Sequence, residues 1–189
     1  GFLFGCEERD LCKRAEDVFE KSVTTKTLSF AELYGSKICA ALDRQHPRDI
    51  FDIMLLLKNE GITDQVRKSF LIYLISHNRP IAELLSPNLK DMKPVFEKEF
   101  AGMALFEVEY DELVRVRISL VDEINKRLTG DERDFLVSFK EKAPKWDLLG
   151  VEGAQEMPAV KWKLANLEKM NDDKHKKAVQ QLKRVIAKD

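Results

Sequence analysis

Two consecutive helices that meet at a sharp corner are the strongest structural prediction this sequence makes. Ser29 and Glu32 form a capping-box pattern, which starts a helix at the next residue after the serine. We expect this helix over 30–45, because a proline pushes the residue before it out of the α region and Pro47 follows. Since proline suits the first turn of a helix, a second helix is expected over 47–59. The corner between them therefore lies near residue 46.

Charged side chains gather at this corner inside otherwise apolar segments. Lys37 and Arg44 fall within the apolar arc of the first helix, and their seven-residue separation is two helical turns. Both are therefore expected to point the same way, toward the interior or a cleft. The second helix is apolar nearly all round, yet its first turns carry Arg48, Asp49 and Asp52, with Arg48 and Asp52 four residues apart.

Two interpretations of this cluster remain open on spacing alone. In the structural one, Asp49 suits the dipole of a first helical turn and a partly buried Arg–Asp network locks the two helices together. In the functional one, Lys37 and Arg44 face a polyanion such as a nucleotide phosphate, and Asp49 or Asp52 orients them or assists a metal. Helical periodicity is the same under both interpretations, so it does not decide between them.

The remainder of the chain predicts a mainly α (α+β) fold, a helical bundle-like domain with a short N-terminal β-hairpin or sheet remnant. Only eight glycines and six prolines occur in 189 residues, which favours helices over a turn-rich β fold. Aromatic and β-branched residues predict two short strands, over 2–4 and 18–25. Further helices are expected over 63–78, 81–85, 88–103 with a break at Pro94, 111–128, 130–142 and from 158 onward, with a loop over 144–157.

We divide the chain into three parts on this basis. Residues 1–28 are expected to be a β remnant of an upstream sheet, 29–143 the helical core with the charged corner, and 144–189 a C-terminal loop and helices that pack on that core. The exposed strand edge would favour pairing with another copy, so a homodimer is expected. Trp146 and Trp162 are interpreted as core residues, not as ligand platforms.

Composition narrows the class of protein. The net charge is −1 with 34% charged residues, so no global basic field directs the chain to nucleic acid. The three cysteines form no Cys-x-x-Cys pair and the three histidines are scattered, which argues against a zinc site. Free thiols indicate a reducing cytoplasm. The apolar run over 53–57 is too short to span a membrane.

The charged corner and several later segments together resemble one family of proteins. The run Leu33-Tyr-Gly-Ser-Lys37…Ala41-Leu-Asp-Arg44…Pro47-Arg-Asp-Ile-Phe-Asp52 is similar to the abortive-infection nucleotidyltransferase toxins of the AbiEii/AbiGii type. The resemblance continues through Gly61-Ile-Thr-Asp64, Tyr73-Leu-Ile-Ser-His-Asn-Arg-Pro80, Glu83-Leu-Leu-Ser-Pro-Asn-Leu89 and Pro158-Ala-Val-Lys-Trp-Lys-Leu-Ala-Asn-Leu-Glu168, and so covers nearly all of the chain.

The resemblance implies a bacterial toxin of a toxin–antitoxin or phage-defence pair, with a cognate antitoxin as partner. Such toxins bind a nucleoside triphosphate (NTP), here expected to be GTP, with Mg²⁺, and transfer a nucleotidyl group to an acceptor such as the 3′ end of tRNA. The third family motif matches through Lys37 and Arg44 as phosphate-contacting cations. The fourth matches through Arg48, Asp49 and Asp52; Lys37, Asp49 and Asp52 are thus the expected catalytic residues, and Lys37, Arg44 and Arg48 the expected nucleotide-binding ones.

The first two family motifs, a Gly-Ser or Gly-Gly turn and a strand with paired carboxylates, have no match in the 36 residues before Lys37. Because those carboxylates hold the metal, we expect the chain to be the C-terminal part of such a toxin, without assigned metal ligands and inactive by itself. The alternative is a non-catalytic helical module for binding or oligomerisation that contacts antitoxin or RNA. A wholly structural helical domain is a third, weaker option.

The C-terminal segment allows two interpretations of its own. Residues 160–189 hold nine Lys or Arg and four acids, a local net charge of +5. Because the acids are interleaved, a solvated helix face explains the pattern. If the whole enzyme acts on tRNA, this segment is instead where contacts with the acceptor are expected, and those would weaken with salt.

Overall fold

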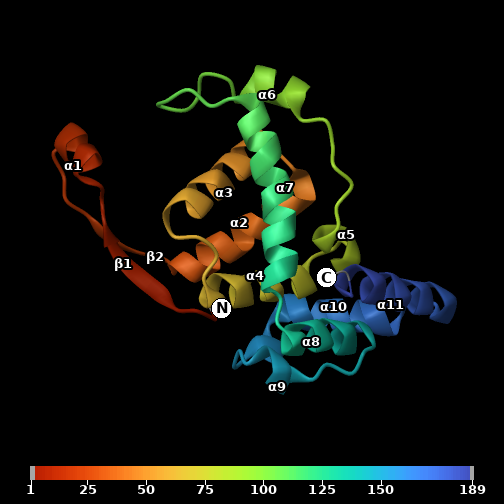
Figure 1. The fold of residues 1–189 in the computed structure, drawn as a ribbon. Coiled ribbons are helices and arrows are strands. Elements are labelled where there is room, and N and C mark those ends of the chain that lie inside the picture. The colour runs from red at the N-terminus through yellow and green to blue at the C-terminus, as the bar shows by residue number, and fades with distance from the viewer. Residues whose placement is uncertain (1–2, 188–189) are drawn as a thin grey trace.

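Helices and one small sheet make up the computed structural model, which describes residues 3–187 (Figure 1). The mainly helical fold class expected from the sequence is confirmed. In chain order the elements are β1 (Cys6–Asp10), α1 (Lys13–Phe19), β2 (Thr24–Leu28), α2 (Phe30–Arg44), α3 (Pro47–Asn59), α4 (Asp64–Ser76), α5 (Ile81–Leu85), α6 (Lys93–Glu99), α7 (Tyr110–Arg127), α8 (Gly130–Lys140), α9 (Trp146–Leu149), the 3₁₀ helix η1 (Ala154–Glu156), α10 (Pro158–Glu168) and α11 (Asp172–Ile186).

The predicted corner between α2 and α3 is present, and local capping explains both of its arms. The Ser29 side chain accepts a hydrogen bond from the backbone N–H of Glu32 at 3.3 Å, which starts α2 as predicted. At the other end Gln45 adopts a left-handed conformation with φ of 53°, and Pro47 then opens α3. The left-handed residue turns the chain through the corner in one step.

The Gln45 side chain fixes this corner to the rest of the molecule. Its amide nitrogen donates to the carbonyl of Asn88 at 2.8 Å, and its amide oxygen accepts from the backbone of Lys90 and from Arg117 of α7, each at 3.0 Å. A glutamine that is only 3% exposed thus satisfies both halves of its amide. The sequence gives no local signal for this role.

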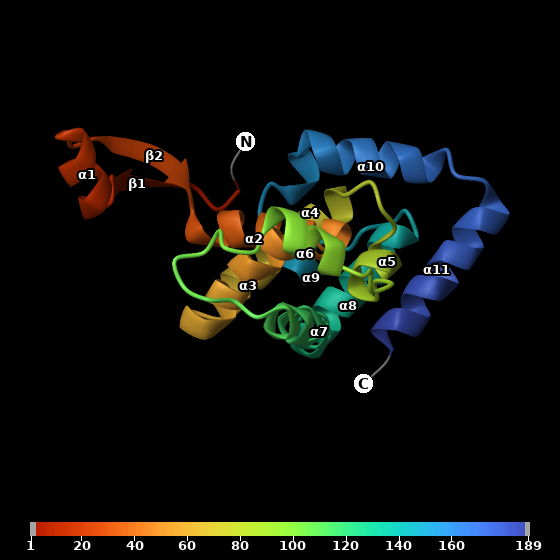
Figure 2. The same cartoon turned by 90° about the horizontal axis from the view of Figure 1, so that it is seen from above.

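The core lies where α2 crosses α4, with α3 packed between α2 and α7 (Figures 1 and 2). Gly35 permits the close approach of α2 to α4, because a Cβ there would lie 2.4 Å from the Ser69 hydroxyl oxygen and 2.7 Å from the Phe70 backbone nitrogen. The largest fully buried side chains include Phe70, Phe135 and Phe139. This packing buries the side of α2 that faces α4. The side of α2 that carries the corner cations faces outward beside α3.

The N-terminal hairpin projects from the helical body, with α1 at its tip (Figures 1 and 2). Its strands are antiparallel, with Cys6 opposite Leu28 and Asp10 opposite Thr24. The strand positions expected from sequence were wrong: 13–19 is helical and only the end of the segment 18–25 is extended. Leu3 and Phe4 pack against the helical core, so they are used there and not in a strand. Residue 2 of the expected strand 2–4 lies outside the described residues.

Other differences from the sequence prediction are local. The helix expected over 88–103 is reduced to α6, and the segment expected as a loop over 144–157 contains α9 and η1. Trp146 does pack in the core, with its ring 5.5 Å from that of Phe135 and 6.2 Å from that of Phe139. Trp162, also expected in the core, is 52% exposed. Among residues 3–187 no helix combines the length and apolar character needed to cross a membrane.

Candidate functional site at the corner of α2 and α3

Two ion pairs join α2 to α3 at the predicted corner. The Lys37 ammonium lies 2.5 Å from Oδ2 of Asp52, and Nη2 of Arg44 lies 2.7 Å from Oδ1 of Asp49. Each pair takes its cation from α2 and its carboxylate from α3. Four of the five residues predicted for the site are therefore brought together, in pairings that join the two helices.

The cations are more accessible than their place in the apolar arc of α2 led us to expect. The Lys37 side chain is 32% exposed and that of Arg44 is 62% exposed, so Arg44 reaches solvent and not the interior. A long side chain can cover apolar surface with its stem while the charged end stays in water, which reconciles the pattern with the position. Both charged ends are within reach of an anion in solution.

Asp49 is the most enclosed member of the cluster. Its side chain is 15% exposed, and its second oxygen, Oδ2, is buried without a hydrogen-bond partner among residues 3–187. A buried carboxylate oxygen without a donor is costly, and such atoms are concentrated at functional sites. Asp49 is thus the member of this cluster whose environment is least explained by folding alone.

Arg48 lies apart from this group. Its Nη2 donates to the backbone carbonyl of Glu99, the last residue of α6, at 3.0 Å, and His46 Nε2 lies 3.3 Å from a carboxylate oxygen of the same glutamate. Arg48 therefore joins the start of α3 to the end of α6. It does not pair with Asp52, although the two are one helical turn apart.

A second charged group, which the sequence reasoning missed, borders the first. Nε of Arg79 lies 2.6 Å from Oδ1 of Asp43, and Nε2 of His77 lies 3.5 Å from its other oxygen. Burial lowers the pKa of His77, although Asp43 acts in the opposite direction. His77 and Arg79 lie in a segment that the family resemblance includes, and Arg79 could reach a phosphate by its position, but nothing in the sequence places the two beside Asp43.

An open cavity of about 320 Å³ is lined by Arg44 of the corner and by Asp43 and His77 of the second charged group. Arg44 and Asp43 lie on its rim together with His77, and Tyr73 lines one side; burial raises the pKa of this tyrosine. The full lining is Ser36, Cys39, Ala40, Asp43, Arg44, Tyr73 and His77. The corner thus offers the exposed cation of Arg44 next to a hollow surface.

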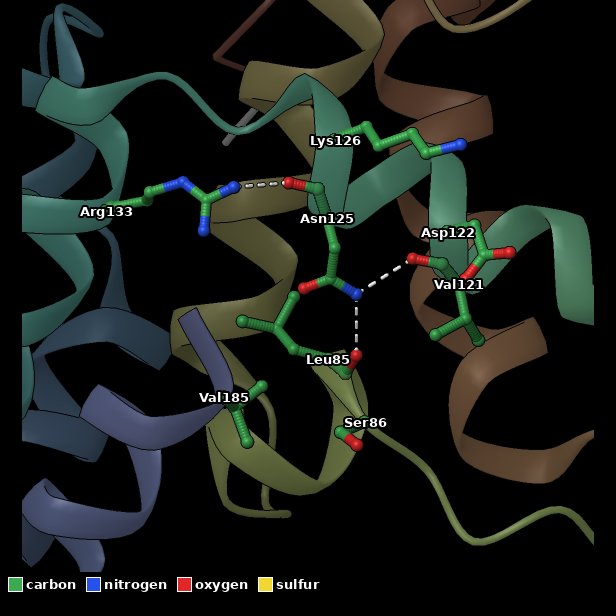
Figure 3. A pocket seen from close by; sticks show the side chains of 8 residues that line it. All are labelled: Leu85, Ser86, Val121, Asp122, Asn125, Lys126, Arg133 and Val185. Atoms are coloured by element: carbon green, nitrogen blue, oxygen red, sulfur yellow. Dashed lines mark hydrogen bonds between the residues drawn. The ribbon is translucent and has the colours of Figure 1, made fainter. Parts of the chain in front are cut away.

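A larger cavity of about 470 Å³ lies elsewhere, between α5, α7 and α11 (Figure 3). Arg133 donates to the backbone carbonyls of Asn125 and Ile186, and Nδ2 of Asn125 donates to the carbonyls of Leu85 and Val121. The carbonyls of Leu85, Asn125 and Ile186 lie at helix ends, so these bonds have a structural role. None of the residues predicted for the site lines this cavity. The larger of these two cavities is therefore not at the charged corner.

The described residues do not fit a magnesium site by themselves. Within 3–187 no three His, Cys, Asp or Glu side chains come together in a way that could hold a metal ion. The two carboxylates at the corner, those of Asp49 and Asp52, each accept a charge-assisted hydrogen bond from a cation. What the corner presents to a ligand is positive charge held in place by carboxylates.

One protein-family model matches most of the chain. The family model described as nucleotidyl transferase AbiEii toxin, type IV toxin–antitoxin system, matches residues 2–166. No curated protein and no solved structure matches the chain. The family match spans both helices of the corner and most of the helical body, and it confirms the resemblance found in the sequence. The chain belongs to the AbiEii family of nucleotidyl transferase toxins of type IV toxin–antitoxin systems.

Proposed function

We propose that the α2–α3 corner binds the phosphates of a nucleoside triphosphate during nucleotidyl transfer, with Lys37 and Arg44 as the contacting cations. The observation that carries this proposal is that both cations share one side of α2, each held by a carboxylate of α3. Seven residues of helix rise by about 10 Å. Lys37 and Arg44 would therefore contact different phosphate groups of one triphosphate chain.

The two aspartates have different proposed roles. Asp52 orients the Lys37 ammonium, which a flexible four-carbon stem would otherwise leave mobile. Asp49 orients Arg44 and is our choice for a catalytic or site-organising acid, supported by its buried, partnerless Oδ2. Arg48 stays a proposed nucleotide contact, but binding would require it to release the Glu99 carbonyl that it now contacts.

The finer assignments are part of the same proposal. The donor is GTP or another NTP with Mg²⁺, and the acceptor is the 3′ end of tRNA, in a bacterial system of abortive infection and phage defence with a cognate antitoxin. The reaction would take place in the cytoplasm, which is supported by the two exposed free thiols of Cys6 and Cys12.

We further propose that this chain alone transfers nucleotides weakly or not at all. Two-metal nucleotidyl chemistry needs carboxylates that are free to hold the metal. The corner carboxylates instead hold Lys37 and Arg44, at 2.5 and 2.7 Å. The chain would then supply phosphate-binding cations to a site that is completed by other carboxylates.

Isothermal titration calorimetry of GTP, ATP, CTP and UTP with Mg²⁺ into the 189-residue chain tests the phosphate-binding role. We expect Lys37→Ala to weaken binding by roughly 10–100-fold, since a hydrogen bond to a charged group contributes about 1.5–3 kcal/mol. Lys58→Ala is the matched control, because Lys58 is an exposed lysine of α3 that pairs with Glu112. A folded Lys37→Ala variant that binds as the parent chain does, or a parent chain that binds no triphosphate, would overturn the proposal.

A second candidate function is that of a binding or oligomerisation module, which the N-terminal hairpin favours. Around its tip Leu11, Val18, Phe19 and Val23 are exposed, and α1 has no buried residue. The outer edge of β2, rich in threonine, offers unpaired backbone groups to a strand from an antitoxin or a second copy. Light scattering on the parent chain and on Phe19→Ser would test homodimerisation, since a dimer lost in the variant supports this surface.

A further inference from the structure

A small cavity lies beside the turn that follows α4, separate from the charged corner. Its volume is about 160 Å³, and it is bounded by α8, α10 and the start of α5. The side chains that define its chemistry are Asn78, Lys140, Trp162, Lys163 and Asn166. His77 faces the corner cavity while the next residue, Asn78, lines this one, so the turn separates the two.

Two buried lysines meet at this cavity. Lys163 is 8% exposed, and its ammonium donates to the backbone carbonyls of His77, Asn78 and Arg79. Lys140 is 5% exposed and lines the cavity, and its Nζ is not among the fully buried side-chain atoms of residues 3–187 that lack a hydrogen-bond partner. Lys163 is thus saturated by its own chain, whereas the Lys140 ammonium, on a mostly buried side chain, reaches the accessible surface of the cavity.

The electrostatics of this pair favour an anion. Burial lowers the pKa of Lys140, and burial together with the nearby charge of Lys140 lowers the pKa of Lys163 to about 8. Partial burial disfavours the charged form of Lys140, and charge-assisted bonds from an anion in the cavity would offset that cost. No carboxylate lines the cavity to fill this role.

An accessible aromatic ring borders the same cavity. Trp162 is 52% exposed although tryptophan usually buries most of its surface, and it directly precedes Lys163 in α10. An exposed ring beside a cation is the arrangement on which proteins stack nucleobases. The amides of Asn78 and Asn166 add hydrogen-bond donors and acceptors next to it.

We propose that this cavity binds one nucleotide unit, with its phosphate at Lys140 and its base against Trp162. The cavity is smaller than the roughly 300 Å³ at which small-molecule pockets begin. It therefore encloses only part of the ligand, and the base lies over the exposed ring outside. The occupant is a free nucleoside monophosphate or an unpaired nucleotide of a strand. That such a strand is the acceptor of the transfer reaction rests on the proposed function. The binding of a nucleotide at this cavity does not.

Tryptophan fluorescence of the full chain provides the test, since Trp162 is the exposed one of only two tryptophans. The probes are AMP, six-nucleotide oligoadenylate as single-stranded RNA and as DNA, and inorganic phosphate. We expect saturable quenching by AMP or the oligonucleotides, with inorganic phosphate competing without quenching. Tighter binding of the oligonucleotides than of AMP assigns a strand as the occupant, and equal binding assigns the free nucleotide.

Variants separate this site from a non-specific effect. Lys140→Gln should weaken binding at least about 10-fold, whereas Lys161→Gln, a change of an exposed lysine on α10 that does not line the cavity, should not. Trp162→Phe leaves Trp146 as the remaining fluorophore, and ligand should no longer quench the fluorescence. Because Trp162 is exposed, its substitution is not expected to unfold the chain. This variant therefore stays informative if Lys140→Gln fails to fold. Absence of saturable quenching in the parent chain, or equal quenching in folded Lys140→Gln, would overturn the proposal. Lys37→Ala should leave the quenching unchanged, so failure here is distinct from failure of the proposed function.

Discussion

The Lys37 ammonium of α2 lies 2.5 Å from the Asp52 carboxylate of α3, and both side chains remain about one-third exposed. An ion pair this accessible is screened by water and contributes little to stability, typically 0–1 kcal/mol. The pair therefore holds the lysine in one position more than it stabilises the fold. Under the proposed function, this accessible lysine is the cation that an anionic ligand would contact.

A double-mutant cycle on this pair should give a small coupling free energy. We expect Lys37→Met, Asp52→Asn and the double variant each to change the free energy of unfolding by less than about 1 kcal/mol, with a coupling below about 1 kcal/mol. Urea denaturation at low and high salt measures both quantities. A coupling of several kcal/mol would instead make the pair a structural lock, the first of the two interpretations that the sequence left open.

Gly35→Ala should destabilise the fold, although alanine is usually the better helix former by about 1 kcal/mol. The new Cβ would lie 2.7 Å from the backbone nitrogen of Phe70 in α4, and this atom cannot move without shifting the helix. We expect a loss of about 1–3 kcal/mol in the free energy of unfolding, the usual cost of overpacking. Thermal or urea denaturation measures it.

Gly130→Ala is the matched control for this prediction. Gly130 is also a helical glycine, at the start of α8, but nothing lies within 4 Å of where its Cβ would be. Its substitution should be neutral or slightly stabilising. Equal effects of the two substitutions would contradict the close approach of α2 to α4 at Gly35.

The arms of the corner could be predicted from sequence because their signals are local. Ser29 and Glu32 cap α2 through neighbouring backbone groups, and Pro47 restricts its own φ and the conformation of the residue before it. The position of Lys37, Arg44, Asp49 and Asp52 at the same corner followed from helical periodicity alone. Such signals depend on residues a few positions apart, and at this corner the tertiary structure agrees with them.

What could not be predicted depends on residues far apart in the sequence. Helical spacing places Arg48 beside Asp52, but the approach of α6 offers Arg48 the carbonyl of Glu99 instead. Asp43 meets Arg79 only because the turn after α4 returns to the end of α2. Likewise, the apolar residues of α10 do not reveal which of its faces packs against the rest of the molecule. Trp162 is exposed because it lies outside the packed face.

Glu132→Ala should be among the most destabilising single substitutions in the chain. Glu132 is 2% exposed, accepts two hydrogen bonds from Nε of Arg67 at 3.0 and 2.9 Å, and also caps α8 through the backbone N–H of Thr129. Its removal leaves the Arg67 charge buried with one carboxylate fewer, which typically costs about 3–5 kcal/mol. Urea denaturation of the variant measures this loss.

Glu112→Ala is the comparison for Glu132. Glu112 also pairs with a cation of another helix, Lys58 of α3, but that lysine is 55% exposed. We expect a change within about 1 kcal/mol. A similar cost for both glutamates would contradict the buried character of the Arg67–Glu132 pair.

The Lys163 ammonium, which holds the turn after α4 through three carbonyls, should make stability depend on pH in a defined window. The pKa of Lys163 is about 8 in the folded chain and near 10.5 when the chain is unfolded. Between these values the unfolded state binds more protons, so the contribution of Lys163 to the free energy of unfolding rises with pH, and below pH 8 it is nearly constant. Lys163→Met should remove this contribution and leave three carbonyls without their donor, which lowers stability at pH 7 by about 1–3 kcal/mol.

The difference between the parent chain and Lys163→Met, measured by urea denaturation from pH 6 to 9, isolates this effect. Cys39 acts in the opposite direction, because burial raises its pKa to about 12 and the unfolded thiol ionises near pH 9. Since Cys39 is present in both proteins, its contribution cancels in the difference. The difference in free energy of unfolding between the parent chain and Lys163→Met should widen above pH 8. A difference that is constant from pH 6 to 9 would show that Lys163 keeps an ordinary pKa in the folded chain. The three carbonyl contacts would then fully offset the cost of burial.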